Sequence, residues 1–333
     1  MSTQCFGNRW ENIKQIGQGG QSHVFLVSDK TGEFTGDFVL KRLLNPKRID
    51  RFEQEVKAGM ELNHDQIAPI LDFSYESQTK EKPYFVTKYY SGSTLTGIAP
   101  LHPLEALTIF IKICGAVSYA HSKDIVHRDL KPDNIILDDK GSPIILDFGI
   151  CYFVDENNRL TETMEQVGSR YYIAPELEDG RSSSVTHAVD VYALGKILYF
   201  LITNKVFARE NYTGDNDLSR LLQNSQLDYI TQRILSKSVV AIPEQRISVE
   251  VLKQEAIKIH KLLNEHFYPN RVGSQCRFCG EGKYQSISLE GIHAWSYYQS
   301  SDSIKSANDF RLRCNAIACD ICGNIQLFKV TDN

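Results

Sequence analysis

Two patterns of apolar and polar positions divide the chain into a first part that predicts strands and a longer part that predicts helices. Residues 10–45 alternate apolar with polar side chains between glycine-rich turns, as an antiparallel sheet does. Helical spacing of apolar positions then occurs at 51–64, 103–121 and 190–203 and continues to about residue 265, with one strand expected at 85–90. Strands followed by helices predict an α+β domain of two lobes.

Composition changes after these helices. The segment FYPNRVGSQ carries Pro269 and Gly273 and predicts a linker. Five of the eight cysteines lie beyond this segment, and such clustering in a reducing compartment favours metal binding over disulfides. We therefore divide the chain into a large domain at 10–265, a linker at 266–275 and a small module at 276–333.

Charge and hydropathy narrow the setting in which the chain works. The net charge of −4 gives no bulk attraction to nucleic acid or to an anionic membrane. The apolar run Val191–Ile202 is interrupted by Gly195 and Lys196 and falls short of the roughly 20 residues that a membrane span needs. The N-terminal residues lack the apolar core of a secretion signal. We expect a cytoplasmic protein with no membrane partner.

Two short motifs carry the chemistry: HRDLKPDN, which begins at His127, and DFG, which begins at Asp147. Asp129 can accept a hydroxyl proton, Asn134 and Asp147 offer oxygens to Mg²⁺, and Lys131 can neutralise charge on a phosphoryl group in transfer. The two motifs resemble the catalytic segment of protein kinases, and Lys131 at its position resembles the Ser/Thr branch. The resemblance implies ATP and Mg²⁺ as cofactors and a protein Ser/Thr hydroxyl as the acceptor.

A glycine-rich segment near the start resembles the phosphate-covering loop of the same family, GxGxxGxV. In IGQGGQSHV, from Ile16 to Val24, Gly17 and Gly19 match two of the glycines and Ser22 stands where the third is usual. Small residues let backbone N–H groups approach phosphates closely. Taken alone, the segment could equally be a glycine-rich hairpin turn, and its position about twenty residues before a strand lysine favours the kinase reading.

That lysine is Lys41, in FVLKRL. The resemblance implies that it contacts the α- and β-phosphates and pairs with an acidic residue on the following helix. RFEQEV offers Glu53 and Glu55. The spacing from Glu55 to His64 is similar to the family's, so we predict Glu55 as the partner and keep Glu53 as the alternative.

The strand FVTKYY resembles the hinge that joins the lobes of a protein kinase. By this resemblance Thr87 is the gatekeeper residue, and the backbones of Lys88 and Tyr90 hydrogen-bond adenine. The alternative is an edge strand that binds no ligand.

One departure from the family concerns the stack of side chains that links the lobes. By resemblance His127 and Phe148 belong to this stack and are structural. A large apolar side chain usually completes it four residues after the helix glutamate, and here that position is Gly59. Met60 or another side chain is expected to fill the gap. Otherwise a less tightly coupled helix would imply low basal activity or dependence on a partner.

The segment from DFG to APE resembles a kinase activation segment. We predict Thr161 and Thr163 as autophosphorylation sites, with ordinary exposed loop threonines as the alternative. Ser169 replaces the family's threonine in GSRYYIAPE and is expected near the catalytic base. Further on, Arg246 in PEQRIS resembles the arginine that pairs with the glutamate of APE, here Glu176.

Two CxxCG knuckles lie in the last sixty residues, CRFCG and CDICG, and they resemble those of zinc ribbons. Their four thiolates suit a closed tetrahedral Zn²⁺ site, and we predict as ligands Cys276, Cys279, Cys319 and Cys322. Two disulfides or free thiols are the alternative, and Cys314 or His293 could substitute as a ligand. Residues 267–333 hold seven Lys/Arg and six Asp/Glu, so we favour protein recognition over nucleic acid for this module.

These features together resemble a bilobal protein-kinase fold, with a β-rich N-lobe and a helical C-lobe, followed by a small zinc-ribbon-like β module. We expect an ATP-dependent serine/threonine protein kinase with a zinc-binding module for substrate or partner recognition or regulation. A pseudokinase or signalling scaffold with a nucleic-acid- or protein-binding zinc ribbon is the alternative, favoured by Gly59 and Ser22. Retention of the catalytic set argues against it, namely Lys41, Asp129, Asn134 and Asp147.

Overall fold

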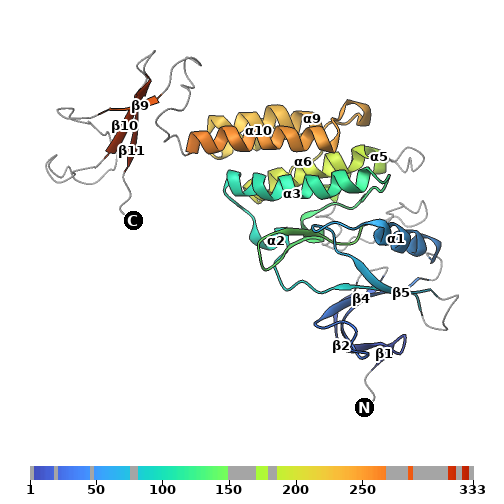
Figure 1. The fold of residues 1–333 in the computed structure, drawn as a ribbon. Helices are drawn as coiled ribbons and strands as arrows, with labels where there is room; N and C mark the ends of the chain where they lie inside the picture. Colours follow the sequence, from blue (N-terminus) through green and yellow to red (C-terminus); the bar gives the residue numbers. More distant parts are fainter. Residues whose placement is uncertain are drawn as a thin grey trace, which may run out of the picture. The chain divides into compact units, whose positions relative to one another are not determined.

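The computed structural model describes residues 4–18, 22–45, 49–75, 82–148, 170–178, 186–267, 284–287, 314–319 and 325–329. The chain divides into two compact units, 1–263 and 264–333. The first unit contains a sheet-rich lobe and a helical lobe, shown in blue and in green to orange in Figure 1. The two-lobed architecture predicted from the order of strands and helices is thereby confirmed.

The sheet-rich lobe, called the upper lobe below although it lies at the bottom of Figure 1, is an antiparallel sheet of six strands, and the helical lobe is called the lower lobe. In spatial order they are β1 (Cys5–Phe6), β2 (Trp10–Gln18), β3 (Ser22–Asp29), β4 (Phe38–Leu43), β6 (Tyr84–Lys88) and β5 (Ile70–Ser74). The alternating pattern at 10–45 corresponds to β2, β3 and β4. Phe25, Val27, Phe38 and Leu40 form a buried cluster with Trp10. The Trp10 indole is fully buried and donates to Asp72 Oδ2 at 2.6 Å, so its one polar atom is satisfied.

Helix α1 (Ile49–Glu61) packs against this sheet through a second, smaller cluster. Phe52 and Val56, one helical turn apart, meet Leu43 of β4 and Phe85 of β6. The helix was expected at 51–64 and ends at Glu61. Leu62, directly after the helix, belongs instead to the core of the lower lobe. The helix and the residue that follows it therefore contribute to different cores.

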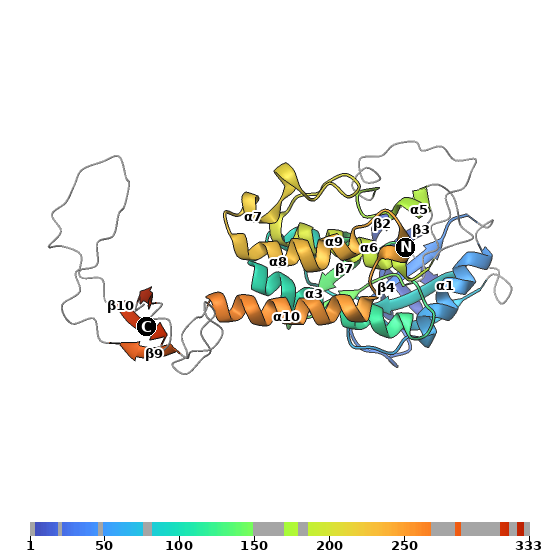
Figure 2. The same ribbon diagram turned by 90° about the horizontal axis from the view of Figure 1, so that it is seen from above.

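The lower lobe is built around α6 (Ala188–Thr203), whose residues are buried from Val189 to Ile202. An all-round apolar helix is stable only inside a core. Figure 2 shows it among its neighbours. Among the described residues, the other α-helices of this lobe are α2 (Leu95–Ile98), α3 (Pro103–His121), α5 (Pro175–Glu178), α7 (Leu218–Leu221), α8 (Asp228–Ile230), α9 (Ser236–Ser238) and α10 (Val249–Phe267). The two-stranded sheet is β7 (Ile135–Leu137) and β8 (Pro143–Ile145).

Helix α3 is, within the described part of the chain, the one helix long and apolar enough to cross a membrane by length and composition. Its most apolar window is 61% buried inside the structure. The burial fits a core helix of the lower lobe.

The segment that follows β6 lies against the lower lobe. Leu137 N donates to Ser93 O at 3.0 Å, and Thr94 forms an antiparallel bridge with Ile136. Gly92 makes this approach possible, because a Cβ at that position would stand 1.7 Å from the carbonyl oxygen of Leu137. Backbone meets backbone here, and only glycine fits.

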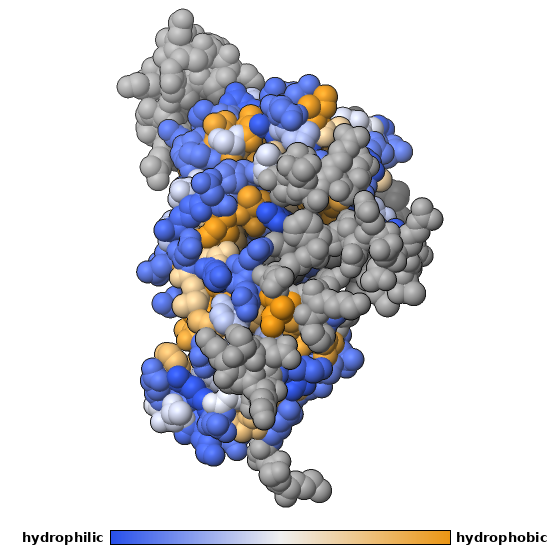
Figure 3. All heavy atoms as spheres, turned by 90° about the vertical axis from the view of Figure 1, so that its right-hand side faces the viewer, coloured by the Kyte–Doolittle hydropathy of each residue, from blue (hydrophilic) through white to orange (hydrophobic). Residues whose placement is uncertain are grey.

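Polar side chains cover most of the described surface on the face in Figure 3. The large apolar residues that are exposed include Met60 in the last turn of α1 and Val206 after α6. Isolated exposed apolar residues are ordinary for a folded domain.

The second unit contains a three-stranded antiparallel sheet in the order β11-β10-β9. Its strands are β9 (Tyr284–Ile287), β10 (Cys314–Cys319) and β11 (Ile325–Lys329). Cys319, the last residue of β10, pairs with Tyr284, the first of β9. The two knuckles, apart from Cys319, lie outside the described residues.

Candidate active site

A buried carboxylate on α6 anchors the loop that carries HRDLKPDN. Asp190 accepts hydrogen bonds from the backbone N–H groups of His127 and Arg128, each at 2.8 Å, and from Nε2 of His121 at 2.8 Å. Burial alone would raise the pKa of Asp190, but the hydrogen bond and charge of His121 and the amide of His127 hold that pKa below its usual value. The carboxylate therefore stays ionised and fixes the start of the loop.

Asp129 is oriented by two side chains of its own loop. Lys131 Nζ lies 2.9 Å from Asp129 Oδ2, and Asn134 Nδ2 donates to the same oxygen at 3.0 Å and to the Asp129 carbonyl at 2.8 Å. The Asp129 side chain is 15% exposed and that of Lys131 is 23% exposed. Three residues predicted to act together thus lie within hydrogen-bond distance and open to solvent.

Asp147 joins this group from the other side. Its Oδ2 lies 3.1 Å from Lys41 Nζ, which reaches down from β4. The residue before it, Leu146, donates its N–H to the Asn134 carbonyl at 2.9 Å. Asp147 adopts a left-handed backbone conformation, φ +54°, and Arg128 does so at +69°. Sparsely populated backbone conformations of this kind gather at functional sites.

His127 and Phe148 are structural, as expected. His127 is fully buried, and its ring lies edge-on to Phe148 at 4.7 Å. Its Nδ1 accepts from the Asp129 N–H at 3.3 Å, so its Nε2 carries the proton that it donates to the Leu146 carbonyl at 3.0 Å. The ring therefore joins the backbone beside Asp129 to the backbone beside Asp147.

The space at Gly59 is filled by a side chain from a strand. Met60 is 55% exposed and does not fill it, so of the two expectations the one of another side chain is confirmed. A Cβ at Gly59 would stand 2.5 Å from Cδ1 of Ile70. The side chain of Ile70, on β5, occupies this space.

The described part of the nucleotide loop belongs to the β2–β3 hairpin. Gly17 pairs with Val24, and Val24 pairs with Lys41 on the next strand, while the Ile16 side chain is 41% exposed. Gly19 and the side chain of Glu55 lie outside the described residues. The choice between Glu53 and Glu55 as the partner of Lys41 therefore stays a prediction.

The hinge region follows directly from the sheet. Thr87 pairs with Val39 on one side and with Ile70 on the other. Tyr89 N–H donates to the Asp37 carbonyl at 3.1 Å, toward the β4 side. Lys88 is the last residue of β6, and recognition of adenine by the backbones of Lys88 and Tyr90 stays a prediction.

The end of the APE motif is fixed by the predicted ion pair. Arg246 donates to both carboxylate oxygens of Glu176, at 2.6 and 2.8 Å, and its side chain is fully buried. Its guanidinium also lies over the ring of Tyr192 at 5.0 Å. Bidentate geometry of this kind is strong and specific. Thr161, Thr163 and Ser169 lie outside the described residues.

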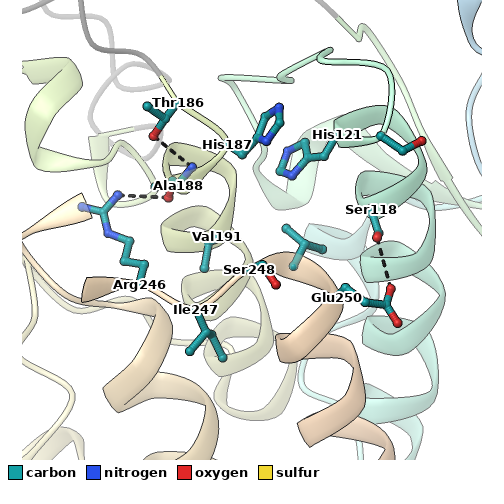
Figure 4. Close-up of a pocket in the computed structure, with 12 residues that line it drawn as sticks. Ser118, His121, Thr186, His187, Ala188, Val191, Arg246, Ile247, Ser248 and Glu250 are labelled. Atoms are coloured by element: carbon teal, nitrogen blue, oxygen red, sulfur yellow. Dashed lines mark hydrogen bonds between the residues drawn. The ribbon is translucent and has the colours of Figure 1, made fainter. Parts of the chain in front are cut away.

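A pocket with a volume of about 490 Å³ lies on the lower lobe beside the Asp190 anchor. Figure 4 shows His121 and His187 side by side at its upper edge, with ring centroids 4.3 Å apart and planes at 10°. Burial lowers the pKa of His187, and the neighbouring His121 lowers it further. No sequence pattern indicates this stacked pair or the contact of His121 with Asp190, because neither forms a motif.

The two lobes, the lysine of β4 and the carboxylates of Asp129, before β7, and Asp147, after β8, define a domain of the kinase class. A sequence model of the protein kinase domain matches residues 10–267, and the chain therefore belongs to the protein kinase family. The crystal structure of the Mycobacterium tuberculosis PknI kinase domain has the same fold, with a TM-score of 0.60 at 22% identity over 78% of this chain and 99% of that one.

Among curated proteins, the chain is 33% identical over 229 residues to serine/threonine-protein kinase PrkC of Bacillus subtilis, covering 66% of this chain and 34% of that protein. It is 35% identical over 235 residues to a probable serine/threonine-protein kinase PknB of Lactococcus lactis, covering 67% and 35%. Serine/threonine-protein kinase D of Synechocystis is 31% identical over 280 residues, covering 79% and 54%. The chain thus spans between about a third and about half of these relatives' lengths.

Proposed function

We propose that this chain is an active ATP-dependent serine/threonine protein kinase. The observation that carries the proposal is the convergence of Lys41, Asp129, Lys131, Asn134 and Asp147 from both lobes into one solvent-accessible group. The similarity to named serine/threonine-protein kinases supports the same acceptor class.

In the proposed reaction the acceptor hydroxyl oxygen attacks the γ-phosphorus of ATP, the bond to the β–γ bridging oxygen breaks, and ADP leaves. Asp129 orients the hydroxyl and takes its proton. Lys131, 2.9 Å from Asp129, also lies where it can neutralise charge on the transferred group. Positioning and charge stabilisation supply most of the rate in such a site.

The donors present suit the Mg²⁺ that the family implies. Asn134 directs its Nδ2 at Asp129, which leaves its side-chain oxygen as the ligand atom, and Asp147 offers a carboxylate. Oxygen ligands of this kind are those that Mg²⁺ prefers. Charge neutralisation on the phosphates is the chemistry that the ion supplies when bound. Lys41, at 3.1 Å from Asp147, would hold the α- and β-phosphates beside it.

A radiolabel transfer assay with a generic protein substrate tests the proposal. Wild-type protein should transfer the γ-phosphoryl group to serine or threonine, and Asp129→Asn should lower the rate by about 10²–10⁴-fold, the range for loss of a general base. Asp139→Asn, which changes an exposed carboxylate on the same lobe, is the matched control. An inactive wild-type protein that still binds ATP would favour the pseudokinase alternative, which none of the described contacts supports.

For the second unit we propose a zinc site formed by Cys276, Cys279, Cys319 and Cys322. The strand register supports it. Cys319, the last residue of β10, pairs with Tyr284, the first residue of β9, so the strand ends next to the two knuckles in the sequence are neighbours in the sheet. Cys314 begins β10 at the other end, roughly 16 Å away at about 3.3 Å per residue, too far to share the site.

Metal analysis of the full chain tests the zinc site with a control that the chain itself provides. We expect one zinc per chain, lost in Cys279→Ser and Cys322→Ser and kept in Cys314→Ser. Retention of zinc in both knuckle variants, or its loss in Cys314→Ser, would contradict this ligand set. We further propose that the module recognises a protein substrate or partner in the cytoplasm. Pull-down experiments with the chelated and with the zinc-loaded chain compare the proteins that each of the two states binds.

A further inference from the structure

A short hairpin precedes the residues that the family model matches. The model begins at residue 10, whereas β1 already pairs with β2 in the sheet of the upper lobe. Gly7 and Asn8 connect the two strands with φ of +56° and +57°, and Arg9 N donates to the Phe6 carbonyl at 3.1 Å. Two successive left-handed residues form a tight turn whose twist suits a two-stranded hairpin. The turn therefore folds Phe6 back over the sheet.

Phe6 is buried on the face of the upper sheet that lies opposite helix α1. Phe25 of β3 and Tyr84 of β6 share this face, with ring centroids 5.0 and 6.4 Å from that of Phe6. Lys41 pairs with Phe85, which packs against α1, and because side chains alternate along a strand both lie on the other face. The contacts of Phe6 therefore lie behind the nucleotide site, across the thickness of the sheet.

Arg42, the neighbour of Lys41 on β4, is held between two aromatic rings. Its guanidinium carbon lies 5.3 Å from the centroid of the Phe6 ring and 5.1 Å from that of the Phe25 ring. Its Nε is buried and has no hydrogen-bond partner among the described residues. Cation–π contact with the two rings therefore stabilises this guanidinium. Loss of the Phe6 ring would open one side of Arg42 to water and loosen β4 next to Lys41.

The turn of the hairpin makes a second contact, with β6. A Cβ at Gly7 would overlap the hydroxyl oxygen of Tyr84, so the backbone of the turn lies directly against that side chain. Glycine alone satisfies both this approach and the positive φ. Tyr84 is the first residue of β6, three residues before Thr87, and it pairs with Arg42. The hairpin thus holds β4 beside Lys41 and β6 ahead of the predicted hinge.

We propose that Phe6 is a positioning residue for the nucleotide, which fixes β4 and β6 relative to each other from behind the site. This inference rests on the proposed function, in which Lys41 holds the phosphates of ATP and the strand at Thr87 leads to the adenine. A change in the relative position of the two strands weakens the binding of ATP before any phosphoryl group is transferred. Asp129 and Asn134 belong to the lower lobe and keep their geometry, so the effect should fall on affinity rather than on kcat.

Calorimetric titration with ATP and Mg²⁺ tests the proposal on the full chain. Phe6→Ala should raise the Kd for ATP about 10-fold and leave kcat within about 2-fold of wild type. Phe6→Leu keeps most of the buried volume, and its Kd should stay within about 3-fold of wild type. Simple destabilisation lowers only the folded fraction and leaves the Kd of the folded protein unchanged. Ile259→Ala, which removes volume from the core of the lower lobe, is the control for that effect.

Gly7→Ala breaks the same contact while it keeps the Phe6 ring. The added methyl group meets the Tyr84 hydroxyl and strains the turn, so the Kd for ATP should rise as it does in Phe6→Ala. Gly32→Ala is the matched control, because Gly32, between β3 and β4, also has a positive φ, +75°, but nothing lies within 4 Å of its Cβ. This control should leave the Kd for ATP unchanged.

Hydrogen exchange without nucleotide separates this proposal from the proposed function. The amides of β4 and β6 should exchange faster in Gly7→Ala and in Phe6→Ala than in wild type, while those of α3 in the lower lobe keep their rates. Unchanged exchange in β4 and β6, or an unchanged Kd for ATP in Gly7→Ala, overturns the proposal. A wild-type protein that binds ATP and shows these changes, but transfers no phosphoryl group, would overturn the kinase function alone. A wild-type protein that binds no ATP would overturn both.

Discussion

The two lobes hold their catalytic groups by different means. In the lower lobe, buried hydrogen bonds fix the geometry. Asp190 accepts hydrogen bonds from the two backbone amides that precede Asp129, and Arg246 donates two hydrogen bonds to Glu176. In the upper lobe, the helix beside Lys41 is held by apolar contacts, and at Gly59 one of these comes from a neighbouring strand. A buried polar network accepts one arrangement, whereas an apolar contact tolerates small displacements. The lower lobe is therefore the rigid reference and the upper lobe the adjustable half.

The largest effect is expected from the anchor of the lower lobe. Asp190→Asn keeps the shape of the side chain but replaces a carboxylate that accepts from three donors by an amide with one oxygen. The free energy of unfolding should fall by about 3–5 kcal/mol, the sum of a lost charge-assisted bond and an unsatisfied buried donor. Urea unfolding measures it, with the exposed Asp215→Asn as control. A loss under about 1 kcal/mol would show that Asp190 does not fix the geometry of the lower lobe.

Glu176→Gln should cost less, about 2–3 kcal/mol. The amide keeps one of the two bonds to Arg246 but leaves a buried guanidinium without its counter-charge. Thermal unfolding compares this variant with Glu244→Gln, which makes the same change at an exposed side chain of the same lobe. Equal melting temperatures for the two variants would show that the pair is not a fixed point of the lower lobe.

One buried glycine in each lobe can be used to compare how well the two lobes tolerate an added methyl group. A Cβ at Gly195 on α6 would stand 2.2 Å from Ser238 Oγ and 2.7 Å from Val239 Cγ2, whereas at Gly59 it meets the far end of Ile70. Gly195→Ala should therefore destabilise by about 1–3 kcal/mol. Gly59→Ala should cost less, because the Ile70 tip can rotate and alanine favours the helix. The reverse order in unfolding experiments would break the contrast between a rigid and an adjustable lobe.

The smallest effect concerns pH. Burial and the stacked His121 lower the pKa of His187 in the folded chain, while the carboxylate of Asp124, 3.8 Å away, opposes this. Just below pH 6.5 the unfolded chain therefore binds a proton at His187 more readily than the folded chain does. The free energy of unfolding falls as the pH is lowered, until the pH lies below the pKa of His187 in the folded chain. His187→Gln should flatten this decline between pH 7.5 and 5.5 in urea unfolding, and His23→Gln should not. An unchanged slope in His187→Gln would show that the stack does not disfavour the charged ring.

Sequence patterns predicted most of what is local in this fold. Helix α3 begins and ends at the expected residues, Pro103 and His121, because a proline start and a continuous apolar face are both visible in the chain. The catalytic motifs placed Asp129 and Asn134 on one short loop for the same reason. The separate strands β5, β7 and β8 were not predicted, since three to five residues carry too little periodicity.

The contacts that join distant parts could not be predicted in the same way. Ile70 fills the space above Gly59 although the two residues share no pattern, and the exposed Met60 was as reasonable from the sequence. His121 reaches Asp190 across 69 positions. Such contacts depend on how elements pack in three dimensions, which is a property of side-chain volume and direction rather than of spacing along the chain.

The glycine at position 92 has a mechanical consequence. Since the backbone there lies directly on the Leu137 carbonyl, and Ser93 and Thr94 are bonded to β7, the connection between the lobes is already part of the lower lobe at that point. Tyr89, in turn, is still bonded to the upper sheet through Asp37. Tyr90 and Ser91 lie between these two points, and the Ser91 side chain donates to Asp139 at 3.2 Å. We therefore expect any change in the angle between the lobes to be taken up by the backbone torsions of a few residues around Tyr90.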